Sequence, residues 1–317
     1  MILSVSRRTD IPAFYHEWFL NRIKEGFVVI KNPKNEHQIR KVNLDPEVVD
    51  SIVFWTKNPG PMIPYLDELN SYSYYFLYTI NPYDRNIEKD LPAIDKRLRM
   101  FKTLSEKIGK NRIVWRYDPI IFSKEWDVDY HIEQFDILSD ILKYYTDTVI
   151  ISFLQFYRVH RKSLLERGFR EPDSDEVRKV CVEIVNLCKK KGLKVQSCAE
   201  EKNLISFGVF PGKCVDDERI SGLLGEKIKG KTDPSLRNKC LCIESIDVGA
   251  YNSCLYDCIY CYANHIKKDH RISNAIRHNK NSPILLGEIE DLQNLTEREA
   301  KSFKMKSEQL DLFDEFD

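Results

Sequence analysis

The sequence predicts an α/β protein whose parallel strands form a (β/α)8 barrel of the TIM type. Short β-rich runs recur along the chain, and charged segments with helical periodicity separate most of them. Eight such runs over about 250 residues match the number and length that a closed barrel needs, and the chain has 317 residues. A doubly wound open sheet is the main alternative, because it shows the same alternation of strands and helices.

The β-rich runs define the expected strands in chain order. They are rich in β-branched and aromatic residues, and polar residues or prolines end nearly all of them. The best-defined helix between them covers residues 175–191, where apolar residues recur with helical spacing, and Gly192 ends it. The expected strands are residues 2–5, 27–30, 51–55, 74–80, 112–117, 148–154, 193–197 and 241–248.

Composition and charge restrict the class of protein. Hydrophobic residues make up 42% of the chain, and no apolar run approaches the roughly 18 residues that cross a membrane. The first ten residues carry no signal-peptide pattern, so we expect a cytoplasmic protein. The 49 basic and 49 acidic residues balance, which argues against a molecule that attracts nucleic acid over its whole surface. Nine cysteines in a reducing compartment indicate metal ligation or redox chemistry.

The same patterns divide the chain into three parts. Residues 1–239 are expected to form the barrel body. Residues 240–280 hold the last strand, a cysteine-rich cluster loop and a basic helix. Residues 281–317 form a charged, partly flexible C-terminal tail.

Charged residues follow several of the expected strands directly. In a barrel the C-terminal ends of the strands open on one mouth, where chemistry gathers. Three cations at these positions would meet there and suit an anionic substrate or a cofactor carboxylate. Polar residues are common in loops, so a single position means little and the argument rests on the set. The candidate residues for positioning substrate or cofactor are Arg7, Asp10, Lys57 and Arg116.

The most specific pattern is the spacing C-x3-C-x2-C made by Cys254, Cys258 and Cys261. Three thiolates from one short loop can each reach a different iron of a 4Fe–4S cluster. A structural zinc site prefers paired C-x2-C elements that supply four ligands. The loop is polar, which argues against buried core cysteines, so we expect an iron–sulfur site.

The remaining six cysteines fall into two groups. Cys181 and Cys188 lie seven residues apart on the apolar face of the expected helix, which favours core packing. The other four either hold a second cluster or a zinc ion, complete the first cluster, or are buried thiols. They are Cys198, Cys214, Cys240 and Cys242.

The cysteine spacing resembles that of radical S-adenosylmethionine enzymes, and residues 258–264 (CIYCYAN) resemble spore photoproduct lyase and its relatives most. That resemblance implies a 4Fe–4S cluster whose fourth iron binds S-adenosylmethionine and whose reduction cleaves it to a 5′-deoxyadenosyl radical. The whole chain resembles a bacterial family, domain of unknown function 1848. The shared segments are residues 4–12 (SVSRRTDIP), 55–59 (WTKNP), 198–200 (CAE) and 247–251 (DVGAY).

The chain departs from ordinary radical S-adenosylmethionine enzymes in the order of its parts. Their cysteine loop follows the first strand, whereas here it follows the last, and only 56 residues come after Cys261. A circularly permuted barrel would keep the loop at the same mouth, because strands one and eight are neighbours. The chain also lacks a clear Gly-Gly-Glu run, which would bind the cofactor's amino group.

The C-terminal part carries two further patterns. Residues 265–280 are basic, which fits a solvated helix face or contact with nucleic-acid phosphates, with aromatic residues nearby for stacking on bases. The segment from Gln309 to Phe313 resembles the short peptide that docks bacterial repair enzymes on the DNA sliding clamp, and an amphipathic tail that packs back on its own domain is the alternative. The clamp residues are Gln309, Leu310, Asp311, Leu312 and Phe313, and the nearby aromatic residues are Tyr256, Tyr260 and Tyr262.

Together these patterns lead to one main hypothesis and two alternatives. The main one is an iron–sulfur enzyme of radical S-adenosylmethionine type that acts on DNA, in lesion repair or modification, and receives electrons from a donor. The first alternative is a metal-stabilised DNA-associated protein without radical chemistry. The second is a barrel enzyme of small-molecule metabolism.

Overall fold

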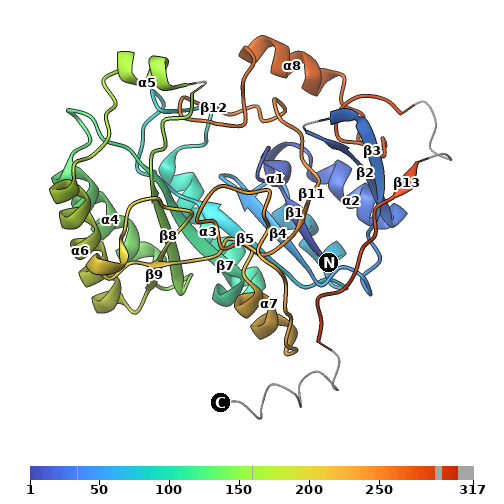
Figure 1. Cartoon of the computed structure of the whole chain (residues 1–317), viewed down its shortest axis with the longest axis horizontal. Helices are drawn as coiled ribbons and strands as arrows, with labels where there is room; N and C mark the ends of the chain where they lie inside the picture. The colour runs from blue at the N-terminus through green and yellow to red at the C-terminus, as the bar shows by residue number, and fades with distance from the viewer. Residues whose placement is uncertain (34, 159, 290–294, 306–317) are drawn as a thin grey trace.

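The protein is built around an eight-stranded parallel sheet (Figure 1). The structure is a computed structural model and describes residues 1–33, 35–158, 160–289 and 295–305. The strand order is β10-β9-β8-β7-β5-β4-β1-β11, and every neighbouring pair is parallel. The strands are β1 (Ile2–Val5), β4 (Ser51–Thr56), β5 (Tyr74–Thr79), β7 (Ile113–Ile120), β8 (Thr148–Phe153), β9 (Lys194–Ser197), β10 (Phe210–Pro211) and β11 (Ile246–Asp247).

The α/β class with a large parallel sheet is confirmed, whereas closure into a barrel is not shown. Within the described ranges β10 and β11 stand at the two ends of the ladder and do not pair. The chain segments beside these two strands approach each other, since the N–H of Ile243 donates to the carbonyl of Val215 at 3.2 Å. The strands therefore stand in chain order from β1 to β10, and the hydrogen-bond ladder is interrupted between β10 and β11.

Seven of the eight expected strands lie in this sheet, and one does not. The run at residues 27–30 belongs to β2 (Phe27–Asn32), which pairs antiparallel with β3 (Asn35–Asn43) in a separate small sheet. A four-residue apolar run has the same pattern in a hairpin and in a parallel strand, so periodicity could not separate the two. The eighth place is taken by β10, whose two residues give no periodic signal.

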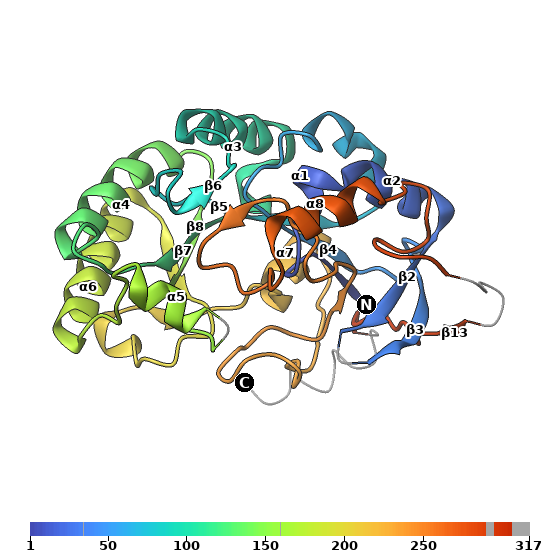
Figure 2. The same cartoon turned by 90° about the horizontal axis from the view of Figure 1, so that it is seen from above.

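Helices cover one face of the sheet (Figure 2). The expected helix at 175–191 is confirmed as α6 (Ser174–Lys191), which begins with a capping box at Asp173 and ends at Gly192 with φ of +68°. Cys181 and Cys188 are buried on its inner side, as expected. The other helices of this layer are α2 (His16–Glu25), α3 (Ile94–Ile108) and α4 (Val128–Leu142).

The opposite face of the sheet is also buried, beneath the chain between β9 and β11. Alternate strand residues such as Val53, Tyr75 and Val114 point to this side and pack with residues from the segment 198–243. Burial on both faces is typical of parallel sheets. This segment contains four of the cysteines, so they lie against the sheet's inner face.

Short elements connect the layers and cap the sheet. Residues 281–289 and 295–305 run back over the protein, where β13 pairs with β3 and the N–H of Phe303 donates to Asp50. None of the helices in the described ranges is long and apolar enough to traverse a membrane. The short elements are α1 (Ile11–Phe14), α5 (Arg161–Glu166), α7 (Asp217–Leu224), α8 (Lys268–Ile276), η1 (Ile63–Leu69), η2 (Lys110–Arg112), η3 (Ile205–Phe207), β6 (Glu88–Lys89), β12 (Asp257–Cys258) and β13 (Thr296–Glu297).

A buried histidine makes the fold sensitive to acid. His131 on α4 lies 2.9 Å from the Tyr117 hydroxyl and 2.7 Å from the carbonyl of Ile121. Burial lowers the pKa of His131 from 6.5 to about 4. The folded protein therefore holds this ring neutral. The stability that the neutral His131 contributes is fully present above pH 6.5 and is lost as the pH falls toward 4.

We expect His131 alone to lower the free energy of unfolding by about 2 kcal/mol between pH 7 and pH 5. Urea unfolding at both pH values measures this drop. His131→Asn should be less stable at pH 7 but lose less stability on acidification, whereas the exposed His37→Asn should behave as the wild type does. An unchanged pH dependence in His131→Asn would contradict the assignment.

Candidate functional site

The cysteine loop, defined here as residues 249–264, lies across the C-terminal ends of the central strands. Its short strand β12 pairs antiparallel with β6, which places Cys258 opposite Glu88 in the loop after β5. In Figure 1 the segments around β12, α5 and α8 lie together along the upper edge, and in Figure 2 α8 crosses the middle of the molecule. The loop that follows β11, the last strand of the sheet, thus reaches the segment after β5.

Buried hydrogen bonds hold this loop in shape. Arg271 of α8 donates to the carbonyls of Cys254 and Tyr256 at 2.8 and 2.9 Å, and pairs with Asp257 at 2.6 Å. Asn264 donates to the same two carbonyls at 3.2 Å. A buried carbonyl without a partner costs about 1–3 kcal/mol, so these donors stabilise the loop conformation strongly.

The three cysteines of the loop are partly exposed, and their thiols have polar surroundings on the protein side. Burial, together with the neighbouring Cys261 and Asp10, raises the pKa of Cys254 to about 12. Burial also raises the pKa of Cys258 and of Cys261. Backbone donors oppose this effect: N–H groups of Asp10 and Tyr256 point at Cys254, and those of Ala263 and Asn264 point at Cys261.

Asp10 joins the exit of β1 to that of β4. Its carboxylate accepts hydrogen bonds from the hydroxyl of Thr56 and the N–H of Lys57, both at 2.7 Å, and caps α1 through the N–H of Ala13. Burial raises the pKa of Asp10 to about 6, and these three donors oppose the rise. The carboxylate fixes the peptide of Lys57 and leaves the lysine side chain to other partners.

Lys57 lies in a buried cluster built around Glu88. Its ammonium group is 2.7 Å from the Glu88 carboxylate and 3.0 Å from the Tyr260 hydroxyl of the cysteine loop. Arg97 of α3 contacts the other Glu88 oxygen at 3.2 Å, and Asn81 donates at 2.9 Å to the oxygen that Lys57 contacts. Burial opposes ionisation of Glu88, but Lys57 and Arg97 outweigh it and lower the pKa of this carboxyl below its ordinary value.

Arg7 and Arg116 lie at two other strand exits. Arg116 forms an ion pair with Asp118, which also accepts a hydrogen bond from Ser152 of β8. The Arg116 Nε is buried and has no hydrogen-bond partner among the described residues. The guanidinium of Arg7 lies 4.9 Å from the ring centre of Trp55 and donates to Ser245 at 3.1 Å.

Two of the three expected cations come together, and each of the three has a carboxylate neighbour. Arg7 and Arg116 both lie near the phenol of Tyr262, and Lys57 lies nearer Cys258. Sequence reasoning did not select the carboxylates. Asp247 lies in the shared segment 247–251, Asp118 directly follows the expected strand 112–117, and Glu88 lies in none of the segments selected from the sequence. A rule that seeks an acid near each clustered cation could have found Asp118, since it follows Arg116 by two residues.

The other four cysteines, called here the four-cysteine group, also come together although 44 residues separate the first from the last. The thiols of Cys198 and Cys214 are 3.3 Å apart. Cys242 forms side-chain hydrogen bonds with Cys214 and Cys240. Arg7 and Arg116 lie close to this group as well as to the cysteine loop.

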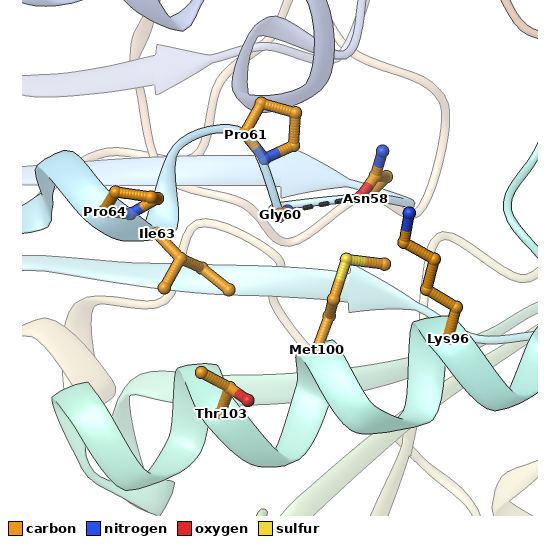
Figure 3. Close-up of a pocket in the computed structure, with 8 residues that line it drawn as sticks. All are labelled: Asn58, Gly60, Pro61, Ile63, Pro64, Lys96, Met100 and Thr103. Carbon is orange, nitrogen blue, oxygen red and sulfur yellow. Dashed lines mark hydrogen bonds between the residues drawn. The ribbon is translucent and has the colours of Figure 1, made fainter.

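Two surface hollows beside the site have no cysteine in their walls. One, of about 410 Å³, lies between η1, α3 and the loop after β4, with Asn58, Lys96 and Met100 in its wall (Figure 3). The other, of about 390 Å³, reaches Ile259 at the flank of the loop. In the described ranges, no group of three or more His, Cys, Asp or Glu side chains stands ready to hold one metal ion.

The basic segment at 265–280 is largely paired with acids. Lys268 contacts Asp90 at 2.6 Å, Lys280 contacts Glu17 at 2.7 Å, and Arg271 is buried. Two of the aromatic residues proposed for base stacking are enclosed: Tyr256 is buried, and Tyr260 bonds to Glu88. Tyr262 is the one of the three with a large exposed fraction, 43%. The clamp-like peptide 309–313 lies outside the described residues.

The fold and the site define a parallel α/β protein with a cysteine loop across its strand ends. The chain belongs to the family described as Domain of unknown function (DUF1848), whose family model matches residues 2–263. This range contains the whole sheet and all nine cysteines. No curated protein and no solved structure was found to match the chain.

Removing Arg271 should loosen the cysteine loop. Arg271→Met leaves two buried carbonyls and Asp257 without this donor, so we expect the free energy of unfolding to fall by roughly 3 kcal/mol. Urea unfolding and the rate of proteolytic cleavage within residues 249–264 measure the effect. Arg277→Met, on the exposed side of the same helix, is the matched control, and equal behaviour of the two variants would refute the anchoring role.

Proposed function

We propose that this protein is an iron–sulfur enzyme of the radical S-adenosylmethionine type, with a 4Fe–4S cluster on Cys254, Cys258 and Cys261. The observation that carries the proposal is a C-x3-C-x2-C loop lying across the C-terminal ends of parallel strands. Ligands of parallel α/β proteins bind at these ends. The family match adds no activity, so the argument rests on these residues.

The surroundings of the loop fit a cluster. Each of the three thiolates binds a different iron of a cubane, so the three sulfurs do not have to meet at one ion. Backbone N–H groups that point at Cys254 and Cys261 are the donors that stabilise ligating thiolates. The high thiol pKa values mean that proton loss needs a compensating positive charge, which bound iron supplies.

Charged residues beside the loop suit an anionic group of the cofactor or substrate. The bound cluster would supply the electron that cleaves S-adenosylmethionine. Arg116 keeps one buried N–H without a partner among the described residues, and Arg7 lies close to the same tyrosine, so these two would orient a carboxylate. Asp10 and Lys57 would act as positioning residues. Asp10 fixes the peptide of Lys57, and the ammonium group of Lys57 holds the hydroxyl of Tyr260, which lies two residues after Cys258.

We also propose that the sheet is an opened (β/α) barrel with the cluster loop after its last strand. The strands follow chain order from β1 through β10, and β11 returns to the open side of β1. The bond between Ile243 and Val215 supports a near-closure on that side. In this arrangement a loop after the last strand opens on the same mouth as a loop after the first, which agrees with the permuted order of the motif.

The proposal predicts iron and sulfide on the cysteine loop and an iron open to the cofactor. After anaerobic purification, the protein should contain about four iron and four sulfide ions at this loop. The electron paramagnetic resonance signal of the reduced cluster should shift on addition of S-adenosylmethionine. Cys258→Ala should remove these iron ions and the shifted signal, whereas Cys188→Ala in the α6 core should keep both.

Two outcomes would change the assignment. A cluster whose signal ignores S-adenosylmethionine would indicate an iron–sulfur protein without radical chemistry. Absence of iron and sulfide in anaerobically purified protein would remove the cluster itself and leave the loop as a structural element.

DNA is the substrate class that we propose, on the basis of the likeness of residues 258–264 to lesion lyases and of the clamp-like peptide. Removing residues 306–317 should abolish binding to a bacterial sliding clamp, because Leu312 and Phe313 supply the apolar anchor. Leu312→Ala with Phe313→Ala should have the same effect, and Glu315→Ala should bind as the full chain does. A full-length chain that does not bind the clamp would favour small-molecule metabolism.

A further inference from the structure

The four-cysteine group lies at the inner face of the sheet and is separate from the cysteine loop in sequence. Cys198 follows β9 directly, Cys214 follows β10, and the pair Cys240 and Cys242 precedes β11. These are the segments that flank the open side of the ladder. Three of the four residues are buried and Cys240 is partly exposed, so the group sits under the surface of the protein.

The four thiols lie near one another in pairs. The Sγ atoms of Cys198 and Cys214 are 3.3 Å apart, which is contact without a disulfide, since a disulfide bond is about 2.05 Å long. The thiol of Cys242 lies within hydrogen-bonding reach of the thiols of Cys214 and Cys240. Backbone N–H groups of Cys214 and Val215 point at the Cys242 sulfur at 3.2 and 3.4 Å.

Cations surround this sulfur cluster and face it from separate elements. The guanidinium of Arg237 lies 3.7 Å from the Cys198 sulfur. Arg116 of β7 lies close to Cys198 and Cys214, and Arg7 after β1 lies close to Cys214 and Cys242. Neutral core thiols do not require such neighbours. Cys181 and Cys188 on α6 provide the contrast, because burial is the largest influence on the pKa of both thiols.

We propose that Cys198, Cys214, Cys240 and Cys242 bind one structural Zn²⁺ ion as a four-thiolate site. Four thiolates at about 2.3 Å from a tetrahedral ion stand about 3.8 Å apart, so the Cys198–Cys214 pair needs to separate by about half an ångström. Rotation about a cysteine's single side-chain torsion supplies this movement. Without the ion the thiols contact each other in pairs, and among the described residues they do not form a closed tetrahedron.

The compact contacts favour a single ion over a second iron–sulfur cluster. A cubane attaches each thiolate to a different iron, which spreads the four sulfurs well beyond contact distance. Contact between the sulfurs of two separate segments matches one shared ion more closely. Zn²⁺ is the common partner of four cysteines in structural sites.

The balance of charges and protons is consistent with a zinc ion bound by four thiolates. Zn²⁺ replaces the four thiol protons, which leave to solvent, and the resulting site carries a net charge of −2. The positive charges of Arg237, Arg116 and Arg7 offset it in a region with little water. The N–H groups that point at the Cys242 sulfur are of the kind that orient and stabilise metal-bound thiolates.

The test uses the full chain without an affinity tag, in a Cys254→Ser, Cys258→Ser, Cys261→Ser background that lacks the cysteine loop's ligands. We expect about one zinc ion per chain by mass spectrometry and an X-ray absorption spectrum with four sulfur neighbours near 2.3 Å. Adding Cys242→Ser to this background should lower the zinc content roughly tenfold. Cys181→Ser in the same background should leave the zinc content unchanged.

A second measurement does not depend on whether a ligand variant folds. Refolding the background protein with Co²⁺ in place of zinc should give the sulfur-to-cobalt absorption bands of a tetrahedral thiolate site. Absence of both stoichiometric zinc and these bands would overturn the proposal. Iron with sulfide, or a mass lower by two hydrogens from a Cys198–Cys214 disulfide, would overturn it as well. Because the three cysteines of the loop are absent from this background, none of these outcomes depends on the radical enzyme proposal.

Discussion

A series of buried carboxylates ties each strand exit to its neighbour, and the site depends on it. Asp247 of β11 accepts hydrogen bonds from Ser4 and Ser6 and so joins β11 to the exit of β1. Asp10 joins β1 to β4, as its bonds to Thr56 and Lys57 show. Further along the sheet Glu88 and Asp118 act in the same way. Burying a carboxylate is costly unless donors surround it, so these loops have little freedom to move apart.

The cysteine loop is an additional layer on this arrangement. Tyr260 reaches from the loop into the Glu88 cluster, and the N–H of Asp10 points at Cys254. Arg271 fixes the loop from the other side through the carbonyls of Cys254 and Tyr256. The conformation of the three thiols is thus determined by groups from β1, β4, β5 and α8 together, and local sequence alone does not determine it.

The parts that were predictable from sequence are those with a local signal. Six strands and helix α6 have the period, length and end residues of their class, so they were assigned close to their observed bounds, whereas the expected run 241–248 holds only the two-residue strand β11. The run at 27–30 was assigned to the wrong sheet, because pairing partners are not written in a four-residue pattern. Likewise β10 could not be predicted, since a two-residue strand containing Pro211 exists through its neighbour β9.

The site shows the same division between local and long-range information. Cys254, Cys258 and Cys261 were found because their spacing is short and specific. Glu88 was missed because its partners Lys57, Arg97 and Tyr260 are 31, 9 and 172 residues away in the chain. The contacts of the four-cysteine group likewise span up to 28 residues and depend on the sheet having formed. Spacing rules apply within one loop and do not extend to such groups.

Tyr262 brings the cysteine loop beside the cations of the four-cysteine group. Tyr262, next to Cys261, donates to the carbonyl of Arg7 at 2.6 Å, and the guanidinium groups near its phenol are those that face the four-cysteine group. The thiols of the loop have other cations beside them, Lys57 at Cys258 and Arg271 with Lys57 at Cys261. The two sulfur groups therefore have separate positive neighbours at their sulfur atoms, and Tyr262 carries the contact between the loop and the second set of cations.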